Sequence, residues 1–194
     1  MTRTRQAEVP PDQRAGNAPA RAEAKLRIAT FDDALCIGVL ATQVFLDTYA
    51  TQGIRPALAR EALALYSTAA IAALLQQSAT VFVVAESAGH MLGFAQFTHG
   101  ATHPLVGPSH ATELDRLYVQ ERFSGFGIGT QLLRHAEATA AAHGAATLWL
   151  TAWVGNHRAL RYYTNRGYVD VGPAVYTFND EHFENRVFRR ALSP

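Results

Sequence analysis

Three glycines, Gly125, Gly127 and Gly129, lie between a strand-like stretch and a helix-like stretch, and their spacing suggests a binding function. Glycine has no Cβ atom, so the backbone can approach a ligand closely and turn its N–H groups outward. The first turn of a helix adds further unpaired N–H groups and a partial positive charge. Together these features predict a cradle for an anion such as a phosphate or pyrophosphate. A loop made flexible only for packing remains the alternative interpretation.

The elements on either side of this loop are predicted from their hydrophobic pattern. Residues 113–119 alternate apolar and polar side chains and end in the pair Tyr118-Val119, which is typical of a strand. After the loop, one side of a helix is apolar, with Ile128, Leu132, Leu133 and Ala136. Alanines continue this helix to Gly144, where it is expected to end.

A second helix is predicted after the next predicted strand, residues 147–154, and it begins at a polar residue. Asn156 is of a type that caps helices, and residues 158–166 form the predicted helix, which Gly167 ends. The two helix starts therefore come after two successive strands.

The two segments match two motifs of one family. Ser124-Gly-Phe-Gly127-Ile-Gly129 is similar to the pyrophosphate loop Gln/Arg-x-x-Gly-x-Gly/Ala of the GCN5-related N-acetyltransferase (GNAT) superfamily. The later motif of that superfamily, Asn-x-x-Ala-x-x-aromatic-Tyr-x-x-x-Gly-aromatic, is matched without a gap by Asn156, Ala159, Tyr162, Tyr163, Gly167 and Tyr168. The chain resembles the superfamily over about residues 25–192. Ser124 departs from the pattern, which implies the loss of one charge-assisted contact to the cofactor.

The resemblance implies a fold, a cosubstrate and a set of binding residues. The expected fold is α/β: a mixed, mostly antiparallel sheet flanked by helices, splayed between the two central strands 113–119 and 147–154. The expected cosubstrate is acetyl-CoA, whose acetyl group is transferred directly to an amine. The resemblance places the cofactor against Leu117, Tyr118, Val119, Ser124, Gly125, Phe126, Gly127, Ile128, Gly129, Thr130, Asn156 and Ala159.

The resemblance also assigns catalytic roles. Tyr163 is expected to lie near the sulfur and to protonate the departing thiolate, with packing under the sheet as the alternative role. Tyr162 is the better candidate for packing. The N–H of Val119 or of a near neighbour is expected to polarise the thioester carbonyl. Asn156 either caps its helix, binds the pantetheine amides, or does both. Arg158, Arg161 and Arg166 are candidates for contact with the phosphates.

An amine acceptor requires a base. An amine with a pKa of ~10.4 is neutral at pH 7 only at a cost of roughly 4 to 5 kcal/mol. Glu113 is the preferred base, and the other candidates are Asp115, Asp180, Glu181 and Glu184. Each of these carboxylates has a solvated surface charge as its alternative interpretation.

The acceptor is left open by the sequence. Asp47-Thr-Tyr49 and the run Glu113 to Val119 look closest to the branch that includes bacterial polyamine acetyltransferases, and a peptide or protein amine is the other acceptor class. The pocket is expected from residues 45–54 and 173–183. A non-catalytic acyl-CoA sensor of the same fold is the alternative function, and a homodimer through the late strands is a further possibility.

Length and composition limit the organisation of the chain. With 194 residues, 48% of them hydrophobic, residues 25–194 are expected to form a single domain after a disordered arm of residues 1–24. The net charge of +1 does not favour a nucleic-acid or membrane partner.

The spacing of His99, His103 and His110 fits no common zinc pattern, so no metal is expected. Cys36 is expected to be a buried structural thiol.

The remaining elements are predicted from pattern and turn residues. Strands are expected at 25–29, 81–84, 92–97, 168–171, 174–178 and 186–192, the second and third as a hairpin, with a loop at 98–112.

Thr30 with Asp33 resembles a capping box, and the helix that follows to Tyr49 is expected to bury Leu35, Val39, Ala41 and Phe45. Residues 56–77 are expected to be helical, as two helices meeting near Ser67. Arg60 and Glu61 interrupt this stretch, so no membrane-spanning helix and a cytoplasmic location are expected.

Overall fold

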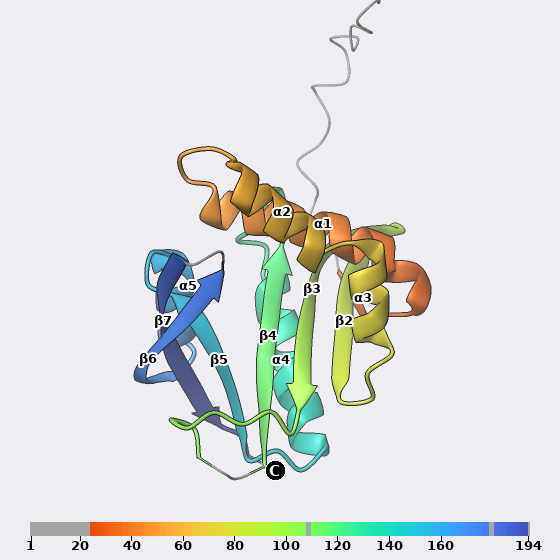
Figure 1. Cartoon of the computed structure of the whole chain (residues 1–194). Coiled ribbons are helices and arrows are strands. Elements are labelled where there is room, and N and C mark those ends of the chain that lie inside the picture. The colour runs from red at the N-terminus through yellow and green to blue at the C-terminus, as the bar shows by residue number, and fades with distance from the viewer. Residues whose placement is uncertain (1–23, 108–109, 179–180, 194) are drawn as a thin grey trace, which may run out of the picture.

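The computed structural model describes residues 24–107, 110–178 and 181–193, and these form one sheet with helices on both faces (Figure 1). The predicted N-terminal arm, residues 1–24, lies outside the described residues apart from Ala24. The candidate base Asp180 lies outside them as well.

The sheet has seven strands in the order β1-β2-β3-β4-β5-β7-β6. Their bounds are Lys25–Ile28 for β1, Thr80–Ser87 for β2, His90–His99 for β3, Ala111–Val119 for β4, Thr147–Trp153 for β5, Val169–Phe178 for β6 and Glu181–Ala191 for β7. All neighbouring strands are antiparallel except β4 and β5, which are parallel. The predicted mixed, mostly antiparallel sheet is therefore confirmed.

Five α-helices cover this sheet. They are α1 at Ala34–Tyr49, α2 at Pro56–Leu65, α3 at Thr68–Leu75, α4 at Ile128–Ala142 and α5 at His157–Thr164. Strand β2 is buried on both sides: Phe82 and Val84 pack with α1 to α3, whereas Val83 and Ala85 pack with α4. Figure 1 shows α1 and α2 crossing one end of the central strands, with α4 behind the sheet.

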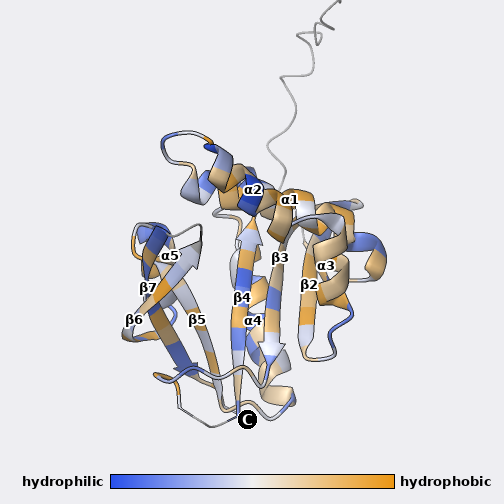
Figure 2. Ribbon diagram, viewed as in Figure 1, coloured by the Kyte–Doolittle hydropathy of each residue, from blue (hydrophilic) through white to orange (hydrophobic). Residues whose placement is uncertain are grey.

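Polar residues interrupt this apolar interior at one place. Figure 2 shows β2 as mostly hydrophobic, whereas the middle of β4 is hydrophilic. A central strand is normally among the most apolar parts of a sheet that is covered on both faces. The polar residues in the middle of β4 therefore mark a candidate site.

The face that α1 buries differs from the prediction. Ala41 and Phe45 are buried as expected, but Leu35 and Val39 are 59% and 64% exposed, and Cys36 is exposed rather than buried. This helix carries apolar residues on all sides, so its periodicity does not define the inner face. The inner face is set by close packing at Gly38, where an added Cβ would overlap the carbonyl oxygen of Tyr66.

Two other segments also differ from the prediction. The expected strands 168–171 and 174–178 form the single strand β6, because the irregularity between Asp170 and Gly172 bends the strand without ending it.

By length and composition, Pro56–Leu75 is apolar enough to cross a membrane, contrary to the expectation based on Arg60 and Glu61. In the structure this stretch is two helices that meet at Ser67, as predicted, and the Ser67 hydroxyl accepts the N–H of Ala70. A spanning helix needs about 20 continuous helical residues, and neither helix reaches that length.

The connection from β1 to α1 contains the predicted capping box. The Thr30 N–H donates to Asp33 at 2.7 Å, and the Thr30 hydroxyl contacts the same carboxylate. The Arg27 guanidinium also donates to Asp33 and, through Nε, to Glu86 at 2.9 Å. This ion-pair network fixes edge strand β1 to β2 and to the start of α1.

Candidate active site

Strands β4 and β5 separate in the middle of the sheet. Their parallel pairing runs from Ala111 and Thr147 to Glu113 and Trp149 and stops there. Strand β4 nevertheless continues to Val119, and β5 continues to Trp153. The facing edges of these two segments leave backbone groups with which a ligand can pair. The predicted splay between the central strands is confirmed.

A bulge on β4 lies where the strands separate. Gln96 of β3 is opposite Arg116, whereas Phe97 is opposite Leu114, so Asp115 is an extra residue on β4. A bulge bends its strand and redirects the side chains next to it. It brings Glu113, Asp115 and Arg116 to the wall of one cavity.

The glycine loop presents a row of free donors. Gly125 and Gly127 adopt left-handed φ values of +85° and +84°, and Gly127 is the N-cap of α4. The first backbone bond that enters the helix is from Gln131 N–H to the Gly127 carbonyl, at 3.0 Å. Among the described residues, the backbone N–H groups of residues 125–130 have no acceptor. This arrangement has the donors of the predicted anion cradle.

The first of two cavities opens onto this loop, and we call it the glycine-loop cavity. Its volume is about 360 Å³. Ten of the twelve predicted cofactor residues line it: Leu117, Tyr118, Val119, Ser124, Gly125, Gly127, Gly129, Thr130, Asn156 and Ala159. The other two do not: Phe126 is 44% exposed, and the Ile128 side chain lies in the core under α4. The Ile128 N–H is nevertheless one of the free donors of the loop.

Of the three arginines considered for phosphate contact, two line the glycine-loop cavity. These are Arg158 and Arg166, whereas Arg161 does not reach it. Arg158 is paired with Glu121 at 2.7 Å. The Arg166 guanidinium lies 3.6 Å from the centre of the Tyr162 ring, and its Nη2 donates to Thr130 at 2.7 Å. Its Nε is buried and has no partner among the described residues.

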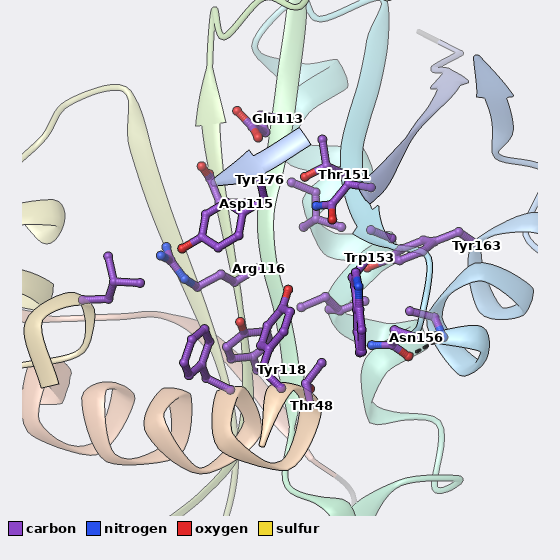
Figure 3. Close-up of a pocket in the computed structure, with 18 of the residues that line it drawn as sticks. Thr48, Glu113, Asp115, Arg116, Tyr118, Thr151, Trp153, Asn156, Tyr163 and Tyr176 are labelled. Atoms are coloured by element: carbon purple, nitrogen blue, oxygen red, sulfur yellow. Dashed lines mark hydrogen bonds between the residues drawn. The ribbon is translucent and has the colours of Figure 1, made fainter. Parts of the chain in front are cut away.

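The second cavity lies on the α1 side of β4 and has mainly aromatic walls, so we call it the aromatic cavity. Its volume is about 320 Å³. The aromatic residues that line it are Phe45, Tyr49, Tyr66, Tyr118, Trp153, Tyr163 and Tyr176. Of the stretches predicted to form the acceptor pocket, Phe45, Thr48, Tyr49 and Tyr176 line this cavity. Figure 3 shows four of these side chains, Tyr118, Trp153, Tyr163 and Tyr176, around the cavity.

The two cavities meet at a shared wall. Both are lined by Thr48, Leu117, Tyr118, Asn156, Ala159 and Tyr163. The Asn156 side chain accepts the Ala159 N–H at 3.0 Å, so the predicted helix cap is confirmed. A ligand that extends from the glycine loop can therefore reach the aromatic cavity beside Tyr163.

Tyr163 is buried, with 8% of its surface exposed. Its ring packs near those of Tyr162, Tyr168 and Phe188, so the packing role also fits it. Its hydroxyl makes no hydrogen bond with the described residues, and the residue lines both cavities. Burial, followed by the nearby Tyr162, raises the pKa of Tyr163 above its usual value. The phenol is therefore protonated at neutral pH and available as a proton donor.

Two of the candidate bases lie in the aromatic cavity. Burial, and then the neighbouring Asp115 carboxylate, raise the pKa of Glu113 from 4.5 to about 7, although Arg116 opposes this shift. Burial also raises the pKa of Asp115, against a hydrogen bond from the Thr98 hydroxyl at 2.8 Å. Glu113 therefore titrates in the range in which a base can both accept and release protons.

The other described candidate bases lie elsewhere. Glu181 forms a bidentate ion pair with Arg55 on the surface. Neither Glu181 nor Glu184 lines the two cavities. The sequence predicted a loop at these two residues, close to the acceptor pocket, but both belong to strand β7 and their side chains are directed elsewhere.

Two polar residues of the aromatic cavity were not predicted. Arg116 is part of the motif on β4, and its position next to Asp115 was the only signal for it. Asn185 of β7 is 7% exposed and lies opposite Trp153 in the sheet register. Its Oδ1 is buried without a partner among the described residues. No local pattern indicates Asn185, because β7 joins the site only through its pairing with β5.

Sequence comparisons agree with this geometry. The acetyltransferase (GNAT) family model matches residues 50–168 of the chain. An uncharacterized N-acetyltransferase of Mycobacterium tuberculosis is 28% identical over 142 residues, which cover 71% of this chain and 86% of that protein. An uncharacterized N-acetyltransferase from the pepI 3′ region of Lactobacillus delbrueckii subsp. lactis is 29% identical over 80 residues. That match spans 41% of this chain and 46% of the Lactobacillus protein.

Solved structures share the fold. A GCN5-related N-acetyltransferase from Rhodopseudomonas palustris has a TM-score of 0.64 at 26% identity, over 87% of this chain and 96% of its own. The PaiA N-acetyltransferase from Thermoplasma acidophilum, solved in complex with coenzyme A, has a TM-score of 0.67 at 18% identity. The latter match covers 87% of this chain and 99% of the Thermoplasma chain.

Proposed function

Because this chain belongs to the acetyltransferase (GNAT) family, we propose that it transfers the acetyl group of acetyl-CoA directly to a primary amine of a small molecule or a peptide. One observation carries this proposal. The glycine-loop cavity and the aromatic cavity meet at Tyr163, where β4 and β5 separate. A thioester from one cavity and an amine from the other can come together there.

The free N–H groups of residues 125–130 would hold the diphosphate of coenzyme A. The coenzyme A bound to the Thermoplasma relative supports this assignment. Arg158 and Arg166 line the same cavity and add positive charge near Ser124, where the family motif has Gln or Arg. The residues present therefore fit an anionic cofactor despite that departure.

The separated edges of β4 and β5 would bind the pantetheine arm, which carries amide groups of its own. Leu117 and Val119 on β4 are past the last pair with β5 and line the cavity. Acetyl-CoA supplies a thioester whose carbonyl carbon is the electrophile. The N–H of Val119 or a near neighbour would donate to the carbonyl oxygen as negative charge develops there.

Glu113 would take a proton from the ammonium group of the acceptor, directly or through a water molecule. With its pKa raised to about 7, the Glu113 carboxylate is a stronger base than an ordinary glutamate. The neutral amine then forms a bond to the carbonyl carbon.

Tyr163 would complete the transfer. As the carbon–sulfur bond breaks, the electron pair stays on the sulfur, and the Tyr163 hydroxyl donates its proton to that thiolate. The products are the acetylated amine and the free thiol of coenzyme A. The second proton of the attacking amine is lost to solvent or to Glu113, and solvent returns a proton to Tyr163.

Release of free thiol from acetyl-CoA tests this proposal. The full chain would be assayed with amino acids, polyamines, aminoglycosides and peptides, while binding of acetyl-CoA is measured separately by calorimetry. Amine-dependent thiol release supports an enzyme. Binding of acetyl-CoA with no thiol release from any amine would instead indicate the alternative function, an acyl-CoA sensor.

A further inference from the structure

The aromatic cavity contains a half-buried arginine, Arg116, that forms no ion pair with the described residues. Five described arginines form ion pairs with carboxylates: Arg27, Arg55, Arg158, Arg186 and Arg190. Arg116 lies in the wall of the cavity and forms no ion pair with any described residue. Its contacts are neutral: Nη1 donates to Gln96, and the guanidinium lies 5.3 Å from the centre of the Tyr66 ring.

A guanidinium in such a place usually has an anionic partner. Removing a charge from water is costly unless a group of opposite charge replaces the lost hydration. The nearest carboxylate in sequence, Asp115, accepts a hydrogen bond from Thr98 and is not within ion-pair distance of Arg116. Gln96 is 2% exposed and holds one side of the guanidinium in place. The other hydrogen-bonding partner of Arg116 among the described residues is the Tyr66 hydroxyl, which is also neutral.

Arg166 provides a parallel in the glycine-loop cavity. It also has only neutral partners, Thr130 and Tyr162, and it lines the cavity proposed to hold the phosphates of coenzyme A. Each cavity therefore contains one guanidinium held by neutral groups. In the glycine-loop cavity the proposed ligand supplies the anion, and the same reasoning requires an anionic group on the ligand of the aromatic cavity.

The opposite side of the cavity suits an amine. Figure 3 places Glu113 and Thr151 at one end, and shows Arg116 and Tyr163 on opposite sides of the cavity. The Asn185 Oδ1, buried and without a partner among the described residues, is an acceptor in the same wall. An amine placed between Tyr163 and Glu113 would thus lie across the cavity from Arg116, and the aromatic rings that line the cavity can pack against methylene groups.

Resting on the proposed function, we infer that the acceptor is an amino acid whose amine and carboxylate are separated by a short aliphatic chain. Arg116 binds the carboxylate, the aromatic rings cover the chain, and Glu113 and Asn185 face the amine. A guanidinium and a carboxylate can form two parallel hydrogen bonds, which makes this pairing specific. A polyamine would place a second ammonium group beside Arg116 and meet like charge.

The test compares acceptors that differ only at the far end. 4-Aminobutyrate, butylamine and 1,4-diaminobutane each carry an amine on a chain of four carbons. The fourth carbon is a carboxylate in the first, a methyl group in the second, and a methylene group that bears a second amine in the third. The values of kcat/KM are measured by thiol release, and the series is repeated with chains of two to six carbons. In the wild type we expect the amino acid of best length to exceed its matched alkylamine and diamine by about tenfold or more.

Substitutions of Arg116 test whether the preference for an amino acid over the matched alkylamine depends on this residue. Arg116→Gln should lower kcat/KM for the amino acid by about 10- to 100-fold more than for the alkylamine. Arg116→Lys keeps the charge and should retain part of the preference. The matched control is Arg60→Gln, which makes the same charge change at an exposed position on α2 and should behave as the wild type. Thermal melting of each variant shows whether it is folded, since Gln96 loses its partner in Arg116→Gln.

The inference is overturned if a diamine, a plain alkylamine or a peptide is the best acceptor of the wild type. It is also overturned if Arg116→Gln lowers kcat/KM for the three matched acceptors by the same factor. Absence of thiol release with every amine would instead contradict the proposed function.

Discussion

Tyr163 combines a buried position with access to both cavities. Its ring is held by neighbouring aromatic rings, and its hydroxyl is free of partners among the described residues. Tyr168 has a similar environment at 3% exposure, but its hydroxyl donates to Glu137 at 2.9 Å and it lines neither cavity. The two tyrosines therefore differ in access and not in packing.

Replacing Tyr163 with Phe should lower kcat roughly 100-fold, because the departing thiolate loses its proton donor. The dissociation constant for acetyl-CoA should stay within about twofold, since the ring remains. Steady-state thiol release and calorimetry measure the two quantities. Tyr168→Phe is the control and should keep the wild-type kcat. An unchanged kcat in Tyr163→Phe would leave Tyr163 only its packing role.

Glu113 should give the enzyme an acidic limb in its pH profile. The carboxylate must be ionised to accept a proton, and its pKa is raised from 4.5 to about 7, so kcat/KM should fall as the pH drops below about 7. Glu113→Gln should lower kcat/KM and remove this limb. A profile that keeps the same limb in Glu113→Gln would assign the base to another group.

The ionisation of Glu113 should also change the stability of the fold. Activity requires the ionised carboxylate, whereas the folded state favours the protonated form. The folded protein holds the Glu113 proton more tightly than the unfolded chain does. The contribution of Glu113 to stability is thus complete below pH 4.5 and is lost as the pH rises through about 7. The free energy of unfolding of the wild type should therefore decline over this range relative to that of Glu113→Gln.

At the scale of elements, the glycine loop and the start of α4 act together. Gly127 has a φ of +84° and caps the helix, and no other atom lies within 4 Å of an added Cβ. Gly144, after the end of α4, has a φ of +80° and equally open surroundings, but it lines neither cavity. The two positions thus share the same backbone requirement, and only one of them belongs to the cradle.

Gly127→Ala and Gly144→Ala should each destabilise the protein by about 1 kcal/mol, because alanine is strained in the left-handed region. Only Gly127→Ala should also weaken acetyl-CoA binding, about tenfold or more, since relief of that strain turns donors away from the diphosphate. Chemical denaturation and calorimetry separate the two effects. Equal affinities in the two variants would show that the loop does not bind the cofactor.

At the scale of the whole molecule, the sheet consists of two parts joined along a short seam. Strands β1 to β4 form one part, and β5, β7 and β6 form the other. Among the described residues, the parts are connected in the sheet only where β4 and β5 pair, from Ala111 and Thr147 to Glu113 and Trp149. A ligand inserted beyond that seam would contact both parts.

Acetyl-CoA should therefore stabilise the whole sheet and not only the glycine loop. At a concentration 100 times its dissociation constant, it should add about 2.7 kcal/mol to the free energy of unfolding. Hydrogen exchange should slow in the segments of β4 and β5 that do not pair with each other, residues 114–119 and 150–153. Protection confined to the glycine loop, or to one strand, would contradict insertion of the pantetheine arm between β4 and β5.

Much of the fold and of the cofactor side could be predicted from the sequence. The strand, glycine loop and helix around Gly127, and the cap at Asn156, depend on residues close together in the chain. Local spacing is sufficient for such elements, because propensity, capping and helix polarity act over a few residues. Ten of the predicted cofactor residues consequently line one cavity.

Part of the acceptor side was decided only by the tertiary structure. Asn185 enters the cavity through the register of β7 with β5, and Arg116 is turned into it beside a bulge on β4. The buried face of α1 was likewise set by its packing against Tyr66, since the helix is apolar all round. These features depend on contacts between segments far apart in the sequence, which no local pattern specifies.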